Sequence, residues 1–125
     1  MSGAVLDSSI WLEYFVGGKH AKTCFKYIQT HKPLWTPSLV IYEVYKKICK
    51  EKSETEGLLV ITQIEGQSEN IISLDERLAL FSADISLKHK LAMADAIIYA
   101  TAIHQEAQLI TRDHHFKGLD EVILV

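Results

Sequence analysis

Two aspartates of this sequence directly follow short apolar segments. Asp7 comes after residues 4–6, and Asp113 comes two positions after the end of residues 109–111. Short apolar runs of this kind are typical of buried parallel strands, and open α/β sheets bind ligands beyond the carboxyl ends of their strands. We therefore expect Asp7 and Asp113 to lie at the same edge of one sheet and to contribute to one site.

Two further acids lie in predicted helices. Asp95 is the only charged residue in the apolar segment 91–103, and an ionised carboxylate in a buried position costs several kcal/mol unless it is paired or binds a metal. Glu43 lies between Tyr42 and Val44, in the first half of its helix. That half is nearest the same sheet edge if the preceding strand runs in the same direction as the others.

Each acid also has an ordinary structural interpretation. Asp7 can cap a helix, and Asp95 can cap a helix that starts at Ala96. Glu43 can be a solvated helix residue, and Asp113 can be a turn residue. A shared site explains the positions of all four acids with a single cause, whereas these alternatives need a separate cause for each.

Clustered carboxylates repel one another and raise each other's pKa values. Hard divalent cations such as Mg²⁺ and Mn²⁺ prefer oxygen ligands and would relieve that repulsion. Such ions lower the pKa of a bound water and stabilise charge on a phosphate, which suits the hydrolysis of phosphodiester bonds. The four acids therefore predict a metal-dependent site for phosphate chemistry.

The elements that must position these acids follow from apolar periodicity and turn residues. Short apolar strands separated by helices predict an α/β fold, a three-layer sandwich in which helices cover both faces of a mostly parallel sheet. The predicted strands span residues 4–6, 33–36, 70–74, 109–111 and 121–125. Four predicted helices span residues 19–30, 55–64, 75–89 and 92–105. Two further helices are predicted, one that ends at residues 17–18 and one that begins at residues 37–38.

Length and composition restrict the class of protein. The 125 residues suit one domain over 1–125, and 48% hydrophobic residues suffice for a core without disulfides. Cys24 and Cys49 show no metal-binding spacing and fit buried thiols in a reducing cytoplasm. The net charge of −3 argues against simple electrostatic coating of nucleic acid. No signal peptide is apparent, and the apolar segment 91–103 is too short for a membrane span.

Four motifs, distributed over the whole chain, resemble those of the PIN-domain family, and in particular its small VapC-type toxin ribonucleases. Each motif alone is weakly specific, whereas their order, their spacing and the chain length together are quite specific. The motifs are Val5–Ser9, Pro37–Ser38 followed by Glu43, Met93–Ile98, and Thr111–Phe116.

The resemblance implies a PIN fold, with a central parallel sheet of about five strands, and cleavage of single-stranded RNA that depends on Mg²⁺ or Mn²⁺. It implies that Asp7, Asp95 and Asp113 are metal ligands. Glu43 would hold a metal directly or through water and orient the attacking water, so that all four acids are catalytic. Ser9 and Thr111 match small hydroxyl positions that steady the acids, although ordinary capping and strand-end roles suit them equally.

One position departs from the family pattern. Many relatives carry a further acid two residues after Asp113, where this chain has His115. This puts a strong second metal site in doubt. His114 and His115 can touch substrate phosphate, and the simpler interpretation is that both are exposed turn residues.

The resemblance also implies partners: an RNA substrate, a cognate antitoxin that covers the active-site groove in a type II toxin–antitoxin pair, and a second copy in a homodimer. Trp11, Phe15 and Phe25 are candidates for lining that groove, with core packing as the alternative for each. The cations that could hold phosphate, unless they are merely solvated, are Lys46, Lys47 and Arg112.

Two other functions compete with the ribonuclease. A catalytically silent PIN-like scaffold that binds RNA or protein would not need four mutually repelling carboxylates. A receiver-type phosphotransferase with Asp7 as acceptor would need a neighbouring acid and a downstream lysine, and neither 7–9 nor 109–113 supplies them.

Overall fold

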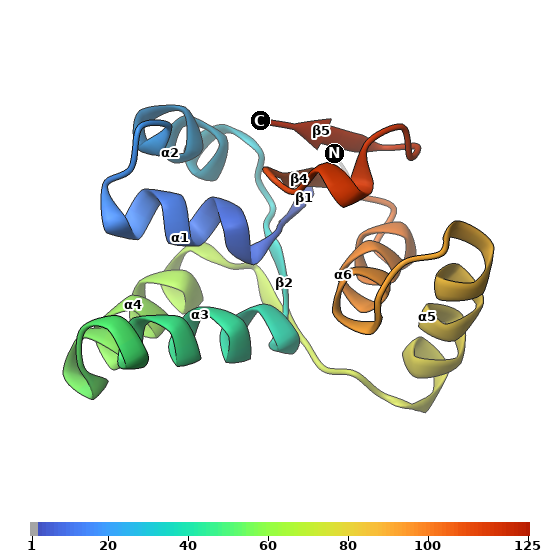
Figure 1. Cartoon of the computed structure of the whole chain (residues 1–125), viewed down its shortest axis with the longest axis horizontal. Coiled ribbons are helices and arrows are strands. Elements are labelled where there is room, and N and C mark those ends of the chain that lie inside the picture. Colours follow the sequence, from blue (N-terminus) through green and yellow to red (C-terminus); the bar gives the residue numbers. More distant parts are fainter. Residues whose placement is uncertain (1–2) are drawn as a thin grey trace.

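The strands and helices expected from the sequence are all present in the computed structural model, which describes residues 3–125 (Figure 1). Their ends differ from the predicted positions by a few residues. The strands are β1 (Ala4–Leu6), β2 (Trp35–Pro37), β3 (Asn70–Ile72), β4 (Gln108–Thr111) and β5 (Val122–Leu124). The helices are α1 (Ser8–Val16), α2 (Ala21–Thr30), α3 (Ser38–Glu51), α4 (Glu54–Gln67), α5 (Glu76–His89) and α6 (Met93–His104), with a 3₁₀ turn η1 (His114–Phe116).

The strands pair in parallel, which confirms the expected fold class. β1 lies beside β4 with Leu6 opposite Ile110, and β4 lies beside β5 with Thr111 opposite Leu124. β2 and β3 form a second parallel pair. The carboxyl ends of β1 and β4 therefore meet at one edge, as the positions of the first two aspartates required.

The expectation of one sheet of about five strands was wrong, because the described strands form a sheet of three, β1-β4-β5, and a sheet of two, β2-β3. One isolated bridge between Ala4 and Leu34 connects them. The Ala4 amide donates to the Pro33 carbonyl at 3.0 Å. Because Pro33 has no N–H to donate, the ladder cannot continue on the N-terminal side of the bridge. On its C-terminal side, no further pairing of β1 with β2 is described.

The helices lie on both sides of the strands. In Figure 1, α1 to α4 lie on one side and α5 and α6 on the other. Helix α6 is buried along most of its length, from Ala96 to Ala102, because it packs between the strands and α5. This position explains why the segment is rich in alanine and isoleucine, and it places the start of α6 near the carboxyl ends of the strands.

Local signals set several helix ends as the sequence predicted. Asp75 caps α5 by accepting a 2.8 Å hydrogen bond from the Leu78 amide. Gly17 ends α1 in the left-handed conformation, with φ of 69°, which costs glycine little. Cys24 and Cys49 are free thiols, and Cys24 is buried as expected, whereas Cys49 is partly exposed. Within residues 3–125, no helix has the length and apolar character needed to cross a membrane.

Candidate metal and catalytic site

Asp7 is the most deeply buried of the four acids, with 4% of its surface exposed. It follows β1 and caps α1, because its Oδ1 accepts a 2.8 Å hydrogen bond from the Ser8 amide. Its Oδ2 accepts hydrogen bonds from the hydroxyls of Ser9 at 2.8 Å and Thr111 at 2.7 Å. Asp7 can therefore cap α1 and also belong to the site. One of its carboxylate oxygens caps the helix, and the other accepts hydrogen bonds from the two hydroxyls that were expected beside it.

The same two hydroxyls connect β1 to the segment that follows β4. The Arg112 amide donates to Ser9 Oγ at 3.0 Å, and the Asp113 amide donates to Thr111 Oγ1 at 2.9 Å. These bonds fix the chain direction after β4. The backbone of Asp113 is thus positioned by a hydroxyl that also contacts Asp7.

Asp95 lies in the first turn of α6, with 18% of its side chain exposed. The alternative that it caps a helix starting at Ala96 is wrong, because α6 begins at Met93 and its N-cap is Ala92. Asp95 is near the N-terminal end of the helix, where the helix dipole favours a negative charge. It therefore reaches the carboxyl-end edge of the strands from a different element than Asp7.

Glu43 lies on α3 and is half-buried, which rules out the interpretation of a freely solvated helix residue. Its Oε1 atom is buried and has no hydrogen-bond partner among the described residues. A buried carboxylate oxygen without a partner is costly. This oxygen therefore needs a water, a cation or a proton.

Neighbouring acids help to raise the pKa values of Asp7, Glu43 and Asp95. Burial raises the pKa of Asp7, against three hydrogen bonds that lower it, and the charge of Asp113 raises it further. Burial also raises the pKa of Glu43, which a Ser8 hydrogen bond lowers and the charges of Asp7 and Asp95 raise. The structure thus places acids from four separate elements in one electrostatic cluster.

Asp95 has a raised pKa for the same reasons. Burial is the largest cause, the charges of Asp113 and Asp7 add to it, and His115 lowers it. Among the ion pairs described for residues 3–125, none joins a lysine or an arginine to one of the four acids.

The sequence interpretation of His115 as an exposed turn residue was incomplete. Its side chain is 77% exposed, yet Nδ1 lies 3.1 Å from Asp113 Oδ1 and 3.5 Å from Asp95 Oδ2. The turn is anchored by its neighbour Phe116, which is fully buried. The signal that could have located His115 in the site was its position two residues after Asp113 in the fourth motif.

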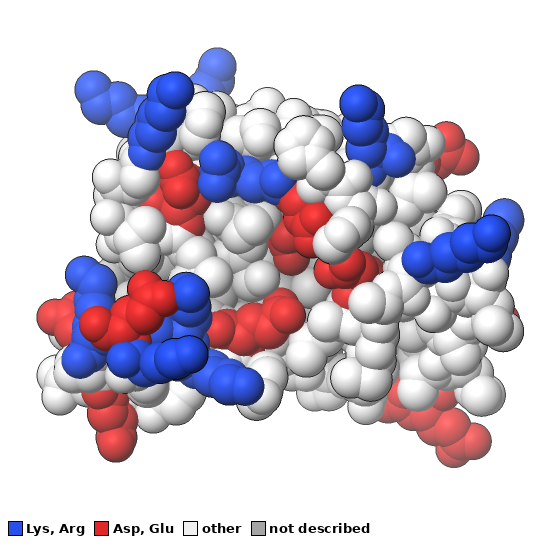
Figure 2. Space-filling view, in the orientation of Figure 1, with Lys and Arg blue, Asp and Glu red and all other residues white. Residues whose placement is uncertain are grey.

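The arrangement fits a divalent cation. One ligand atom each of Asp95, Asp113 and His115 lies within 4.8 Å of the others, and the buried Glu43 Oε1 lacks a partner. Most of the possible ligand atoms are carboxylate oxygens, and few positively charged side chains offset their charge. Such a site suits a hard or borderline divalent ion. Figure 2 shows acidic side chains at the centre of one face, between α1, α3 and α6 of Figure 1, with most basic side chains nearer the rim.

The three cations proposed near the acids differ in availability. Arg112 forms an ion pair with Glu13 at 3.4 Å, and its buried Nε has no partner within the described chain. Lys47 forms an ion pair with Glu51. Lys46 is exposed, and its Nζ donates to the Tyr42 hydroxyl at 3.2 Å. Lys46 is the cation of this set that is not engaged by an acid in the ion pairs described.

The aromatic candidates also separate. Trp11 is 1% exposed and belongs to the core, and Phe15 is half-buried and packs against the core. Phe25 is 45% exposed and stacks on Tyr14 with ring centroids 5.5 Å apart. Phe25 and Tyr14 line a cavity of about 320 Å³ on α1 and α2. Core packing therefore holds for Trp11 and Phe15, and Phe25 faces the surface.

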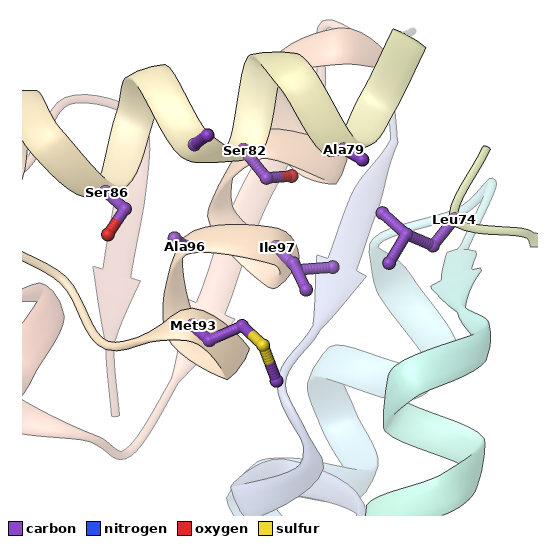
Figure 3. Close-up of a pocket in the computed structure, with 8 residues that line it drawn as sticks. Leu74, Ala79, Ser82, Ser86, Met93, Ala96 and Ile97 are labelled. Carbon is purple, nitrogen blue, oxygen red and sulfur yellow. The ribbon is translucent and has the colours of Figure 1, made fainter. Parts of the chain in front are cut away.

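A second apolar hollow lies between α5 and α6, on the side of α6 that faces α5 (Figure 3). It has a volume of about 360 Å³. Its lining carries no ionisable side chain and its polar groups are two serine hydroxyls, so it offers no acid–base or metal chemistry. It is lined by Leu74, Ala79, Ser82, Ala83, Ser86, Met93, Ala96 and Ile97.

Comparison with known proteins gives consistent results. A PIN-domain family model matches residues 4–122. A toxin–antitoxin complex from Klebsiella pneumoniae contains a chain with 26% sequence identity and a TM-score of 0.80, covering 96% of this chain and 95% of that one. The comparison with curated proteins finds no match.

Two other solved structures share the fold at lower identity. One is VapC20 of Mycobacterium tuberculosis, a sarcin-ricin loop cleaving toxin, with 13% identity, a TM-score of 0.78 and coverage of 95% of this chain and 96% of that chain. The other is VapBC2 of Rickettsia felis bound to a promoter DNA fragment, with 16% identity, a TM-score of 0.75 and coverage of 98% and 96%.

Proposed function

This chain belongs to the PIN-domain family, and on that premise we propose that it is a metal-dependent endoribonuclease, the toxin of a type II toxin–antitoxin pair. In this proposal the whole of residues 1–125 acts as a single nuclease domain. The observation that carries the proposal is the cluster of Asp7, Glu43, Asp95 and Asp113, in which neighbouring acids help to raise the pKa values of Asp7, Glu43 and Asp95. A protein that only binds RNA has no need to bury mutually repelling carboxylates.

The proposed ligands are Asp7, Asp95 and Asp113, with Glu43 acting directly or through water. When bound, Mg²⁺ or Mn²⁺ lowers the pKa of a nearby water and offsets the charge of the scissile phosphate. The hydrogen bonds from Ser9 and Thr111 hold Asp7 Oδ2. These two hydroxyls act as positioning residues, because they fix the carboxylate of Asp7.

Glu43 is suited to handle the attacking water. Burial and neighbouring acids raise its pKa, so its carboxylate accepts a proton more readily than an ordinary glutamate at the same pH. Its buried Oε1 is free to accept a hydrogen bond. A water held there would be oriented by Glu43 and could transfer a proton to it as the water oxygen attacks phosphorus. The bond from phosphorus to the leaving ribose oxygen then breaks, and that oxygen takes up a proton from solvent.

Substrate binding must overcome the negative charge of the site. The net charge of the chain is −3, so long-range attraction to RNA is weak. Lys46 lies one helical turn after Tyr42, which is 57% exposed and directly precedes Glu43. We assign Lys46 to the binding of a phosphate of the RNA. Arg112 could bind phosphate only after its ion pair with Glu13 is broken.

The proposed partners follow from the structures that this chain resembles. The Klebsiella structure is a toxin–antitoxin complex, and we propose a cognate antitoxin for this chain. Of the aromatic candidates, Phe25 is the one exposed for such a contact. We also propose that the chain forms a homodimer, which light scattering during size-exclusion chromatography would test. We further propose that it acts in the cytoplasm.

The test is cleavage of single-stranded RNA by the purified chain with Mg²⁺ or Mn²⁺. Cleavage should require the metal, cease with EDTA, and be lost in Asp7→Asn and Asp95→Asn. The control variant is Asp75→Asn, which alters an acid that caps α5 outside the cluster. RNA binding by the wild-type chain without cleavage in either metal would instead identify the silent scaffold.

A further inference from the structure

His115 occupies a position between two acids that come from different elements. Its Nδ1 lies 3.1 Å from Oδ1 of Asp113 and 3.5 Å from Oδ2 of Asp95. The backbone of His115 is held as well, because its amide donates to Asp113 Oδ1 at 2.9 Å. The imidazole is therefore placed beside both carboxylates by the turn itself, although most of its surface is exposed.

These separations match the spacing of ligands around one ion. Ligand atoms at about 2.1 Å from an octahedral ion are roughly 3 Å apart when adjacent and roughly 4.2 Å apart when opposite. The two distances from His115 Nδ1 are near the adjacent value, and all three ligand atoms lie within 4.8 Å of one another. The imidazole can thus join the carboxylates as a ligand with little rearrangement.

A nitrogen ligand changes which ion the site prefers. Mg²⁺ demands oxygen ligands and gives up water reluctantly, whereas first-row transition ions accept imidazole together with carboxylates. We propose that His115 is a metal ligand with Asp95 and Asp113, and that it makes the site select a first-row transition ion, probed here with Mn²⁺, over Mg²⁺. This inference rests on the proposed function only in that the acid cluster binds a divalent cation.

The neighbouring histidine supplies a matched control. His114 is exposed and is the other histidine of the same turn, but it is not part of the group of metal-compatible side chains. His115→Ala and His114→Ala therefore remove the same side chain from adjacent positions. His115→Asp restores a carboxylate at the position where an oxygen ligand would favour Mg²⁺.

The experiment measures metal binding without reference to cleavage. Mn²⁺ and Mg²⁺ affinities are determined by calorimetry for the wild-type chain and the three variants, and Mn²⁺-loaded samples are examined by pulsed electron paramagnetic resonance for coupling to an imidazole nitrogen. Nitrogen coupling should be present in the wild type and His114→Ala and absent in His115→Ala. Loss of a ligand should weaken Mn²⁺ binding by about tenfold or more, as loss of a ligand's supporting partner already does.

The expected pattern for Mg²⁺ is different. Its affinity should change much less than that of Mn²⁺ in His115→Ala, and it should rise in His115→Asp. Mn²⁺ bound to the wild type without nitrogen coupling, or equal losses for both ions, would overturn the assignment of His115 and leave the nuclease proposal intact. Failure of both ions to bind the wild type would overturn the proposed function together with this inference.

Discussion

The hydroxyl of Thr111 donates a 2.7 Å hydrogen bond to Oδ2 of Asp7 across 104 positions in the sequence. Thr111 ends β4 and Asp7 follows β1, and the two strands are parallel neighbours. The same hydroxyl accepts the Asp113 amide at 2.9 Å. One buried side chain thus sets the position of two of the proposed metal ligands.

Thr111→Val should weaken metal binding while keeping the side-chain shape. The variant removes the donor to Asp7 and the acceptor for the Asp113 amide, and loss of such a supporting hydrogen bond typically costs about 10- to 100-fold in metal affinity. Calorimetric titration with Mn²⁺ measures the effect. Thr101→Val is the control, because Thr101 is equally buried but donates to the Ile97 carbonyl within α6. Equal losses in both variants would contradict this role for Thr111.

Asp95→Asn should abolish cleavage and maintain or raise the stability of the metal-free protein. The substitution removes a charge that raises the pKa of Glu43 and is itself disfavoured by Asp113 and Asp7, so it relieves repulsion in the folded state. Thermal melting in EDTA measures stability. A large fall in melting temperature would show that Asp95 is structural.

The stability of the metal-free protein should depend on pH through these raised carboxyl pKa values. A pKa above the unfolded value means that the folded state binds the proton more tightly, so stability rises as pH falls through the folded pKa and is lost as pH increases. For Asp95 the ordinary value is 3.8 and the folded value is higher. The stability gap between Asp95→Asn and the wild type should therefore be largest near neutral pH and narrow as the pH falls toward the ordinary carboxyl range. Chemical unfolding in EDTA at several pH values measures this gap, and a gap that widens on acidification would contradict the assignment.

Lys46→Met should weaken RNA binding in a salt-dependent manner. Loss of one phosphate contact on a single strand should reduce the slope of log affinity against log salt by about 0.7. Fluorescence anisotropy with labelled RNA, in the inactive Asp95→Asn background, measures the slope. Lys88→Met is the comparison, because Lys88 is an exposed lysine near the end of α5, a helix that contributes none of the four acids. An unchanged slope would remove Lys46 from the substrate path.

Asp75→Ala should reduce stability by about 1 kcal/mol, the usual effect of losing a helix N-cap. Its Oδ1 accepts the Leu78 amide at 2.8 Å at the start of α5. Metal affinity should remain at the wild-type level because the cap lies outside the acid cluster. Urea unfolding measures the change in the free energy of unfolding, and a loss of metal binding would link α5 to the site.

Local signals in the sequence were sufficient to locate most elements. Apolar segments and turn residues indicated each strand and helix, because backbone preference and capping depend on residues a few positions apart. The strand-end rule put Asp7 and Asp113 at one edge, and the apolar surroundings of Asp95 marked it as exceptional. The extent of the sheet was not predictable in this way, since β1 and β2 meet only at an isolated bridge.

The contacts that define the site depend on packing between distant elements. The buried, unpartnered Oε1 of Glu43 arises from the way α3 faces the other acids, and the approach of His115 to Asp95 arises from the way η1 and α6 meet. Each requires two elements to be fixed relative to each other by the core. The sequence by itself determined which residues could do the chemistry and which elements carry them. Only the tertiary structure determined the distances between those residues, because packing across the core sets them.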